Sequence, residues 1–321
     1  MSNMNENQID KKSGLLSNPA TKAKLAKLPG QIMVYAFLGI MALIVLFPFY
    51  FMIVSSLKSL EEYRLAVPTL IPESWKYTNY TDILIPYEWA EAKGLVGTLV
   101  SPDAASNDFD LFTLFRNTMY VGIVSTVLSL VITVLTAFAF ARLEFKGKNA
   151  LFAFLLATMM IPGELFTITN YKTVNDFGWL NTYTVLIIPF LVSVFYIYLL
   201  KQNFMQVPNE LYLAAKVDGT SDIKYLWKVM IPLALPTIIS ITILKMMGSW
   251  NSYMWPRLVA NDANHRLITN GLRSAFTDPS GVTDIPVQMA AVALVSAPLF
   301  LVFIFLRKYI MKGVSRSGIK G

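Results

Sequence analysis

The 321-residue sequence contains no cysteine and a single histidine, His265. Without cysteine, disulfides, thiolate metal sites and a cysteine nucleophile are excluded. A phosphate-binding loop of the form G-x-x-x-x-G-K-[ST] is also missing, because Gly147-Lys148 lacks the upstream glycine and is followed by Asn149. We therefore expect no metal, no cofactor, no ATP site and no enzymatic activity in this chain, and we interpret His265 as a solvated loop residue.

Charged residues are scarce as well. They make up 15% of the chain, against about 25% in soluble domains. Hydrophobic residues reach 55%, and the mean hydropathy is +0.52. A soluble fold could not bury this much apolar surface, so the lipid bilayer is the expected solvent. The net charge of +7 does not indicate nucleic acid, because Lys and Arg cluster beside the apolar runs.

Six apolar segments are long enough to cross a hydrocarbon core, which takes about 20 residues. They cover residues 32–54, 117–141, 149–171, 177–200, 229–256 and 285–306. The third segment holds Glu164 directly after Pro162-Gly163, and a soluble core helix is the alternative reading for it. Prolines within these segments do not argue against membrane helices. The sequence predicts an all-α, polytopic membrane protein with six transmembrane helices.

Basic residues decide the orientation of these spans. The segments on one side hold nearly twice as many Lys and Arg residues as those on the other. By the positive-inside rule, both termini are cytoplasmic in a multi-pass protein of the plasma or inner membrane. The expected organisation is a cytoplasmic leader (1–31) and a transmembrane domain (32–321), with an extracellular loop at 58–112 and a cytoplasmic loop at 201–230.

The cytoplasmic loop carries a distinctive pattern. Pro208 suits a helix start, and an Asp218-Gly219 pair suits a helix end with a left-handed glycine. Thr220 or Ser221 suits the cap of a second helix. Between the two ends, a narrow apolar face is formed by Leu211, Ala214 and Ala215. This pattern predicts two short helices around a turn. On these grounds alone it fits an amphipathic linker on the membrane surface equally well.

The same stretch resembles the cytoplasmic EAA loop of ABC importer permeases, whose pattern is roughly E-x-x-E-A-A-x-x-D-G-A followed by L-P. The matching positions are Glu210, Ala214, Ala215, Asp218, Gly219, Ile231-Pro232 and Pro236. Leu213 stands where the family usually has its second Glu, and Thr220 where it often has Ala. In the family this loop docks into a cleft of the ATPase subunit. The resemblance therefore implies that the coupling residues are Glu210, Leu211, Ala214, Ala215, Asp218 and Gly219.

Further motifs resemble the same family in the same order. They are Ser56-Leu57-Lys58, Trp75 with Asn79-Tyr80, Phe138 to Arg142 with Phe145-Lys146-Gly147, Gly178 to Thr182, Trp250 to Pro256 and Gly318 to Gly321. Together they resemble the second permease of carbohydrate importers, the maltose-permease-G type with a MetI-like fold. The resemblance implies a sugar substrate, a sister permease, two ATP-binding subunits and an extracellular solute-binding protein. The outer loop is longer than is usual in that family.

Several residues of the spans are candidates for the substrate path. Lys245 lies within the fifth apolar segment, where an ionisable group is expected to face the bundle interior or a water-filled cavity. A structural ion pair between Lys245 and Glu164 is one reading, and contact with substrate is the other. Aromatic residues near the span ends also fit interfacial anchoring. The full candidate set is Glu164, Tyr171, Lys245, Trp250, Asn251 and Tyr253.

Two other classes of transport protein stay open at this point. One is an ion-coupled secondary carrier or channel, which gives no reason for the loop at 201–230. The other is an ABC permease for a solute other than a sugar. A membrane-embedded enzyme would need a cluster of carboxylates, His or Cys within the spans, and Glu164 is the one acidic residue found there.

Overall fold

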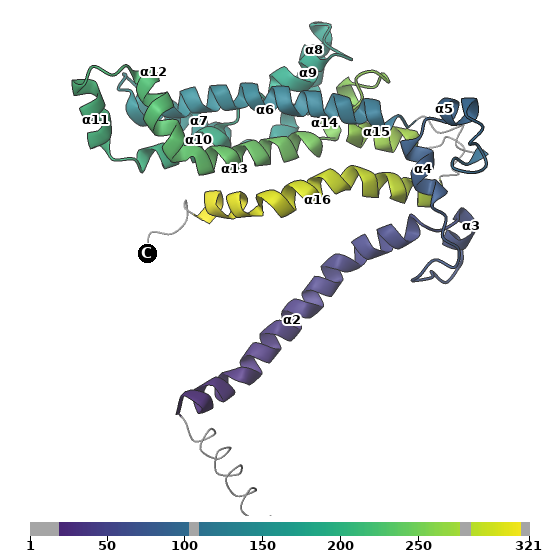
Figure 1. Cartoon of the computed structure of the whole chain (residues 1–321). Coiled ribbons are helices and arrows are strands. Elements are labelled where there is room, and N and C mark those ends of the chain that lie inside the picture. Colours follow the sequence, from purple (N-terminus) through teal and green to yellow (C-terminus); the bar gives the residue numbers. More distant parts are fainter. Residues whose placement is uncertain (1–18, 103–108, 277–283, 316–321) are drawn as a thin grey trace, which may run out of the picture. The chain divides into compact units, whose positions relative to one another are not determined.

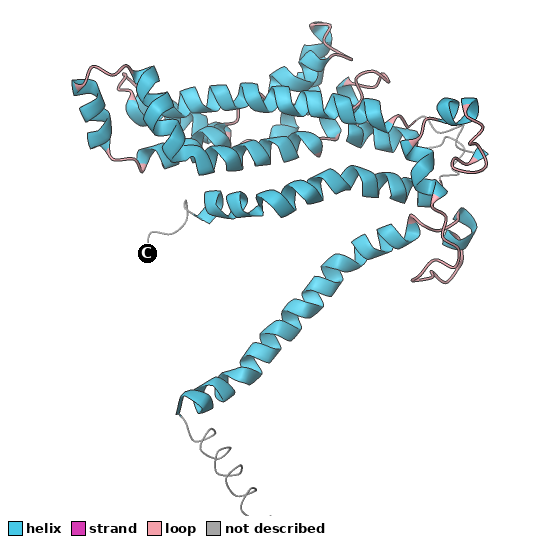
Figure 2. Cartoon of the chain, viewed as in Figure 1, coloured by secondary structure: helices cyan, strands magenta, loops and turns pink. Residues whose placement is uncertain are grey.

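The computed structural model describes residues 19–102, 109–276 and 284–315, which fold almost entirely into helices (Figure 2). Within these ranges the one β-type pairing is an isolated bridge between Val96 and Val100. The prediction of an all-α protein is confirmed. The chain divides into two units, Met1–Trp75 and Lys76–Gly321, and each is described by itself.

The first unit is dominated by one long helix, α2 (Pro19–Ser55). Its segment Gly30–Ser55 is apolar and long enough to cross a membrane. A short helix, α3 (Leu60–Tyr63), follows and is capped by the hydroxyl of Ser59. The next loop folds over the buried carboxylate of Glu62, which accepts hydrogen bonds from Thr69 Oγ1 at 2.7 Å and from the backbone N–H of Glu73 at 3.1 Å.

Three further helices of membrane-spanning length belong to the second unit. They are α6 (Leu111–Arg142), α13 (Ile231–Trp250) and α16 (Ile285–Ser315). On its N-terminal side, α13 runs on from α12 (Asp222–Tyr225) and a π-helical turn, η4 (Leu226–Met230). This continuous segment, Asp222–Trp250, is 29 residues long. It begins earlier than the predicted span at 229–256.

The third and fourth predicted spans are bent rather than straight. Between α7 (Lys148–Thr158) and the segment made of η2 (Gly163–Phe166) and α8 (Thr167–Asp176), the chain turns by 82°. A milder bend of 46° separates α9 (Tyr183–Ile187) and η3 (Ile188–Phe190) from α10 (Val194–Met205). The structure therefore has four helices of spanning length among the described residues, and six spans when each bent pair is one span. Pro162 lies in the first break, between Thr158 and Gly163, and Pro189 lies in η3 just before the second break. Proline removes a backbone donor at each place.

Helix α6 is the central element of the second unit, and it packs against both α10 and α13. Its buried face is rich in small polar residues, namely Thr118, Ser125, Thr126, Ser129 and Thr133. Small side chains let membrane helices approach closely and pack through van der Waals contact. Helix α16 covers the other side of α13 and also contacts α4 (Thr78–Leu84).

The two ends of the second unit differ in content (Figure 1). At one end α11 (Asn209–Val217) and α12 form a helical hairpin. At the opposite end lie α4, α5 (Tyr87–Ala92) and α15 (Ile268–Ala275). Helix α14 (Met254–Val259) follows α13 after a short turn. The bundle thus presents a small hairpin at one end and several short helices at the other.

Candidate functional site

The hairpin of α11 and α12 has the turn chemistry that the sequence predicts. Helix α11 ends at Val217, and Gly219 adopts the left-handed conformation with φ +71°. The N–H of Gly219 donates to Lys216 O at 3.0 Å, and the N–H of Thr220 donates to Ala215 O at 2.8 Å. These two bonds define a Schellman motif, which satisfies the last carbonyls of α11.

The second helix of the hairpin is capped by Ser221 rather than Thr220. The Ser221 hydroxyl accepts a bond from the N–H of Lys224 at 3.4 Å. Next to this cap, Asp222 Oδ1 accepts a hydrogen bond from the hydroxyl of Tyr212 at 2.7 Å. The same oxygen forms an ion pair with the ammonium of Lys216, also at 2.7 Å. The Asp222 hydrogen bond is the main reason that the pKa of Lys216 lies above its ordinary value. Burial, aided by Asp222, raises the pKa of Tyr212. Lys216 therefore stays charged, and Tyr212 neutral, across the physiological pH range.

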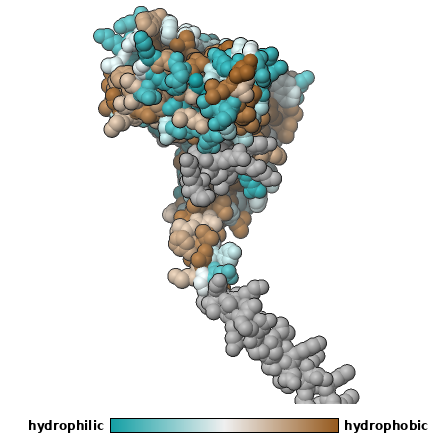
Figure 3. All heavy atoms as spheres, turned by 90° about the vertical axis from the view of Figure 1, so that its left-hand side faces the viewer, coloured by the Kyte–Doolittle hydropathy of each residue, from teal (hydrophilic) through white to brown (hydrophobic). Residues whose placement is uncertain are grey.

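The outer surface of the hairpin is partly apolar. Leu211 is 47% exposed, Leu213 55% and Val217 88%. Figure 3 views the molecule from the side on which the hairpin lies in Figure 1, and hydrophilic and hydrophobic residues alternate over its upper part. Exposed apolar residues at the free end of a bundle are typical of a protein contact surface.

The structure separates the predicted coupling residues into two groups. Glu210, Leu211, Ala214, Asp218 and Gly219 are exposed. Ala215, however, is half-buried and packs on the cluster formed by α6, α10, α12 and α13. Because Ala215 faces the chain's own core, the apolar face predicted from Leu211, Ala214 and Ala215 does not form one outward surface.

Arg142, the last residue of α6, holds the start of the hairpin. Its guanidinium donates to Phe204 O at 2.9 Å, to Asn209 Oδ1 at 3.2 Å and to Val207 O. The first acceptor lies in the last turn of α10, the second is on the first residue of α11, and Val207 lies between the two helices. A single buried side chain thus joins α6 to both helices.

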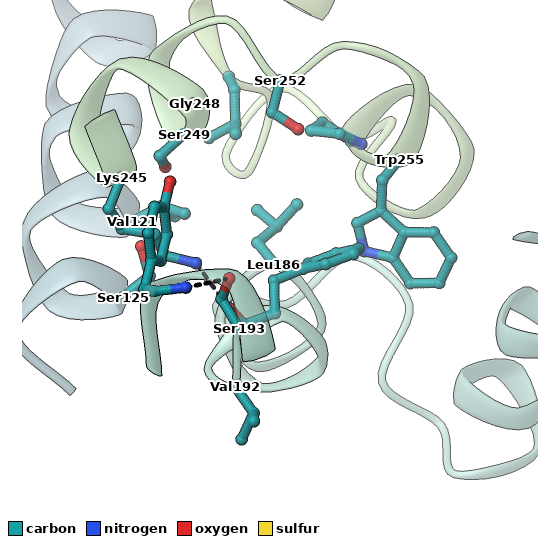
Figure 4. A pocket seen from close by; sticks show the side chains of 14 residues that line it. Val121, Ser125, Leu186, Val192, Ser193, Lys245, Gly248, Ser249, Ser252 and Trp255 are labelled. Atoms are coloured by element: carbon teal, nitrogen blue, oxygen red, sulfur yellow. Dashed lines mark hydrogen bonds between the residues drawn. The ribbon is translucent and has the colours of Figure 1, made fainter. Parts of the chain in front are cut away.

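A second site is a cavity of about 390 Å³ in the second unit (Figure 4). It is lined by residues of α6, of the break between η3 and α10, and of the end of α13 and the start of α14. Its hydroxyl-bearing lining residues are Ser125, Ser193, Tyr196, Ser249 and Ser252. Volumes of about 300–1,000 Å³ are usual for small-molecule sites.

Of the described residues that line this cavity, Lys245 is the one that carries a charge. Its ammonium donates a hydrogen bond to Phe190 O at 2.6 Å. Phe190 is the last residue of η3, so its carbonyl lies at the helix break before α10. Lys245 precedes the end of α13 at Trp250 by five residues, so it lies nearer that end than the predicted span placed it.

The predicted ion pair between Lys245 and Glu164 is wrong. Within the described ranges no ion pair joins Lys245 to any carboxylate. Glu164 lies in η2 and is exposed. The bend between Thr158 and Gly163 interrupts the third span just before Glu164.

The other predicted path residues do not line the cavity. Trp250 is buried against the ring of Phe115, with ring centroids 5.7 Å apart. The amide of Asn251 donates to Met247 O at 2.9 Å. Tyr253 accepts a hydrogen bond from Arg257, and Tyr171 is 37% exposed on α8. Of the six candidates, the structure places Lys245 alone in the cavity.

One wall of the cavity was missed from the sequence. The indole N–H of Trp255 donates to Val185 O at 3.0 Å, and its ring meets that of Phe190 at an angle of 82° and a centroid distance of 5.6 Å. Trp255 belonged to a cluster of aromatic residues that fits a membrane interface equally well, so composition did not distinguish it. The sequence likewise does not reveal that Ser125, Ser193 and Ser249 lie close together, because they belong to elements that are far apart along the chain.

No group of three or more His, Asp or Glu residues that could hold a metal occurs in the described ranges. The lining of the cavity offers hydroxyls, one ammonium and aromatic faces. Such a set is chemically suited to a polar organic solute, through hydrogen bonds, charge and stacking.

Comparison with known proteins identifies the family. Residues 129–316 match the family described as binding-protein-dependent transport system inner membrane component. The inner membrane ABC transporter permease protein YcjP of Escherichia coli is 28% identical, over 89% of this chain and 95% of its own length. The sn-glycerol-3-phosphate transport system permease protein UgpE of Rhizobium meliloti is 30% identical, over 91% of this chain and 97% of its own.

Two further likenesses agree. The arabinooligosaccharides transport system permease protein AraQ of Halalkalibacterium halodurans is 30% identical, over 65% of this chain and 75% of its own length. The structure of a bacterial ABC transporter involved in the import of the acidic polysaccharide alginate contains a chain with the same fold. That chain superposes with a TM-score of 0.74 at 22% identity, covering 88% of this chain and 97% of its own.

These matches confirm the family and the MetI-like permease fold that the motifs predict, and they place the protein in a membrane with several spans. The matched family is a transport component, which confirms the expectation that the chain is not an enzyme. The chain belongs to the family of inner membrane components of binding-protein-dependent transport systems.

Proposed function

We propose that this chain is one of two permease subunits of an ABC importer for a sugar or oligosaccharide. In this assembly a sister permease completes the translocation path, two ATP-binding subunits supply the energy, and an extracellular solute-binding protein delivers the substrate. Relatives named for arabinooligosaccharides and a neighbour involved in alginate import support the substrate class. A sugar-phosphate-like solute is the second candidate, because other relatives are named for sn-glycerol 3-phosphate.

The observation that carries this proposal is the α11–α12 hairpin at one end of the bundle. A docking element needs an exposed contact surface together with a stiff attachment to the helices that it moves. Leu211, Leu213 and Val217 supply the surface. Arg142 supplies the attachment to α6 and α10, and the continuous segment Asp222–Trp250 supplies the attachment to α13.

The same geometry suggests how ATP binding moves the substrate path. An ATPase subunit that pushes on α11 displaces α12 through the contacts of Asp222 with Tyr212 and Lys216. Because α12 is continuous with α13, the displacement reaches the far end of α13, where Lys245 and Ser249 line the cavity. Tightly packed helices transmit such shifts as rigid elements.

The orientation of the chain is part of the proposal. The basic residues favour cytoplasmic termini and a cytoplasmic hairpin. The end that holds α4 and α5 then faces outward and meets the binding protein. Labelling single cysteines placed at Lys12 and Lys320 tests the orientation, since reaction of either with an impermeant reagent on intact cells would reverse it.

Reconstitution in liposomes tests the transport function. The complex of this chain with its sister permease and ATPase subunits is expected to accumulate sugar only with ATP and loaded binding protein. Uptake by this chain alone, driven by an ion gradient, would instead support a secondary carrier. A ligand screen on the binding protein then identifies the solute.

A further inference from the structure

The cavity beside Lys245 has an uncompensated positive charge. Among the described residues, its lining contains no Asp or Glu, and none of their carboxylates lies within ion-pair distance of Lys245. An ionisable group at membrane depth is costly unless it is paired or hydrated, and it marks a functional site by default. The charge of Lys245 therefore calls for a partner that the described part of the chain does not supply.

The hydrogen bond to Phe190 does not account for this charge. A neutral amide side chain would also donate to a carbonyl at a helix break, without the cost of an ammonium. An ammonium has three N–H donors, and Phe190 O takes one of them. That bond holds the side chain in one direction and leaves two donors for a ligand in the cavity.

The neighbouring hydroxyls complete a polar surface. Within the described ranges no protein partner bonds the side-chain hydroxyls of Tyr196, Ser249 and Ser252, all of which line the cavity. Figure 4 shows Lys245 and Ser125 on one side of the space and Trp255 on the opposite side. Trp255 is fixed by its bond to Val185 O, and it presents an aromatic wall of the kind on which a sugar ring packs.

We propose that the transported solute carries a carboxylate or phosphate group and that Lys245 binds this oxyanion in the cavity. Tyr196, Ser249 and Ser252 donate further hydrogen bonds, and Trp255 packs on the solute's carbon skeleton. This inference rests on the proposed import function and narrows its substrate to an acidic sugar or a polyol phosphate. A neutral sugar would leave the ammonium without a counter-charge.

Equilibrium binding tests the proposal on the whole complex. The permease–ATPase complex is placed in nanodiscs without binding protein, so that the cavity itself is measured. The probes are two matched pairs: digalacturonate with neutral galactobiose, and sn-glycerol 3-phosphate with glycerol. The first pair reports on a carboxylate and the second on a phosphate.

Wild-type complex is expected to bind at least one anionic probe about tenfold or more tightly than its neutral partner, the range for hydrogen bonds to charged groups. Lys245→Gln should remove this preference, and Lys245→Arg should retain most of it. Lys228→Gln serves as the matched control, because it removes an exposed charge from the same continuous helix away from the cavity. Co-purification with the ATPase subunits and an unchanged Tm establish that each variant is folded.

Three results would overturn the proposal: equal affinity for neutral and anionic probes, an unchanged preference in Lys245→Gln, or no binding of any probe by wild-type complex. ATP-driven uptake stimulated by binding protein is measured in parallel. If that uptake is intact and the solute is neutral, the import function stands and the assignment of Lys245 fails. If no solute is taken up, the import function itself fails.

Discussion

The guanidinium of Arg142 donates a hydrogen bond to Asn209 Oδ1 at 3.2 Å, which joins the last residue of α6 to the first residue of α11. The same guanidinium also binds the carbonyls of Phe204 and Val207. Arg142 is 9% exposed. If its guanidinium were removed, these carbonyls would be left without a donor in a place that water hardly reaches. Arg142 thus supplies hydrogen bonds between the α11–α12 hairpin and the longest helix of the second unit, beside the apolar packing of Ala215.

Arg142→Gln is expected to weaken coupling and stability together. A buried carbonyl left without a donor costs about 1–3 kcal/mol, and the charged, forked geometry of arginine is not replaced by an amide. The complex should show a lower Tm and less transport per ATP hydrolysed. Asn209→Ala is the matched control, because it removes only one of the three bonds and should have a much smaller effect. Equal effects of the two variants would show that the backbone contacts of Arg142 do not matter.

Gly219→Val is expected to uncouple ATP hydrolysis from transport. The space around Gly219 is open, with no atom within 4 Å of the position that a Cβ would take, but at φ +71° the backbone itself strains a side chain. The left-handed conformation costs most non-glycine residues about 1–2 kcal/mol, and a β-branched residue fits it worst. Gly219→Asn tests the reason, because asparagine tolerates this conformation and should keep most coupling. Normal transport per ATP in Gly219→Val would mean that the turn does not carry coupling.

The hairpin shows how far the sequence alone leads. Its turn at Gly219 and its cap at Ser221 follow from local residue preferences, and both are found. The packing of Ala215 against the core was not predicted, because a helical face does not reveal which of two surfaces it meets. The hydrogen bonds of Arg142 could not be predicted from the sequence either, since two of its three acceptors are backbone carbonyls, which every residue has.

The cavity was less predictable than the hairpin. Run lengths located the spans, but a proline within a membrane helix is compatible with a straight helix, a kink or a break. The break after Phe190 creates the carbonyl that Lys245 binds, and the break at Pro162 removes Glu164 as its partner. Both outcomes depend on bends that the apolar runs do not encode.

Leu211→Asp is expected to weaken binding of the ATPase subunits. Leu211 is 47% exposed on α11, and a carboxylate there would have to be desolvated in an apolar contact. The measurement is the amount of ATPase subunit that co-purifies with the permeases at increasing salt. Leu84→Asp, at a similarly exposed position of α4 at the opposite end of the second unit, is the control and should leave this amount unchanged. Full co-purification of the Leu211 variant would place the docking surface elsewhere.

The stability of the loop after α3 is expected to depend on pH through Glu62. Burial alone would raise its pKa, but the bonds from Thr69 and from the backbone N–H groups of Glu73 and Ser74, with Lys58 nearby, lower the pKa below its ordinary value. A depressed carboxyl pKa contributes stability above the unfolded-state value, and that stability is lost as the pH falls through the folded-state value. Limited proteolysis of residues 60–74 should therefore be constant above pH 5 and rise in more acidic buffer. In Glu62→Gln the loop should be cleaved faster at neutral pH and respond less to acid, and an unchanged acid response would show that another group titrates.

The long loop between α4 and α6 is expected to contact the binding protein. Its described part has a small core of its own, in which Ala90 and Val100 are buried, and the backbone N–H of Ser101 donates to Asp82 Oδ1 at 2.7 Å. Trp89, on α5 within this packed segment, is 51% exposed. An exposed tryptophan on a fixed support is typical of residues that dominate protein interfaces.

Deleting residues 87–106, of which 103–106 lie outside the described residues, should raise the concentration of loaded binding protein needed for half-maximal transport.

Trp89→Ala makes the sharper test, because the side chain is largely exposed and its removal spares the core at Ala90 and Val100. A rise of about tenfold or more in that concentration is expected, since truncating an interface tryptophan commonly costs about 2 kcal/mol or more. Trp89→Phe keeps an aromatic surface and should recover part of the loss. Maximal transport at saturating binding protein should be unchanged in both point variants, because Trp89 neither lines the cavity nor belongs to the α11–α12 hairpin. A lower maximal rate with an unchanged half-saturating concentration would show that the loop serves the transport cycle itself and not the recognition of the binding protein.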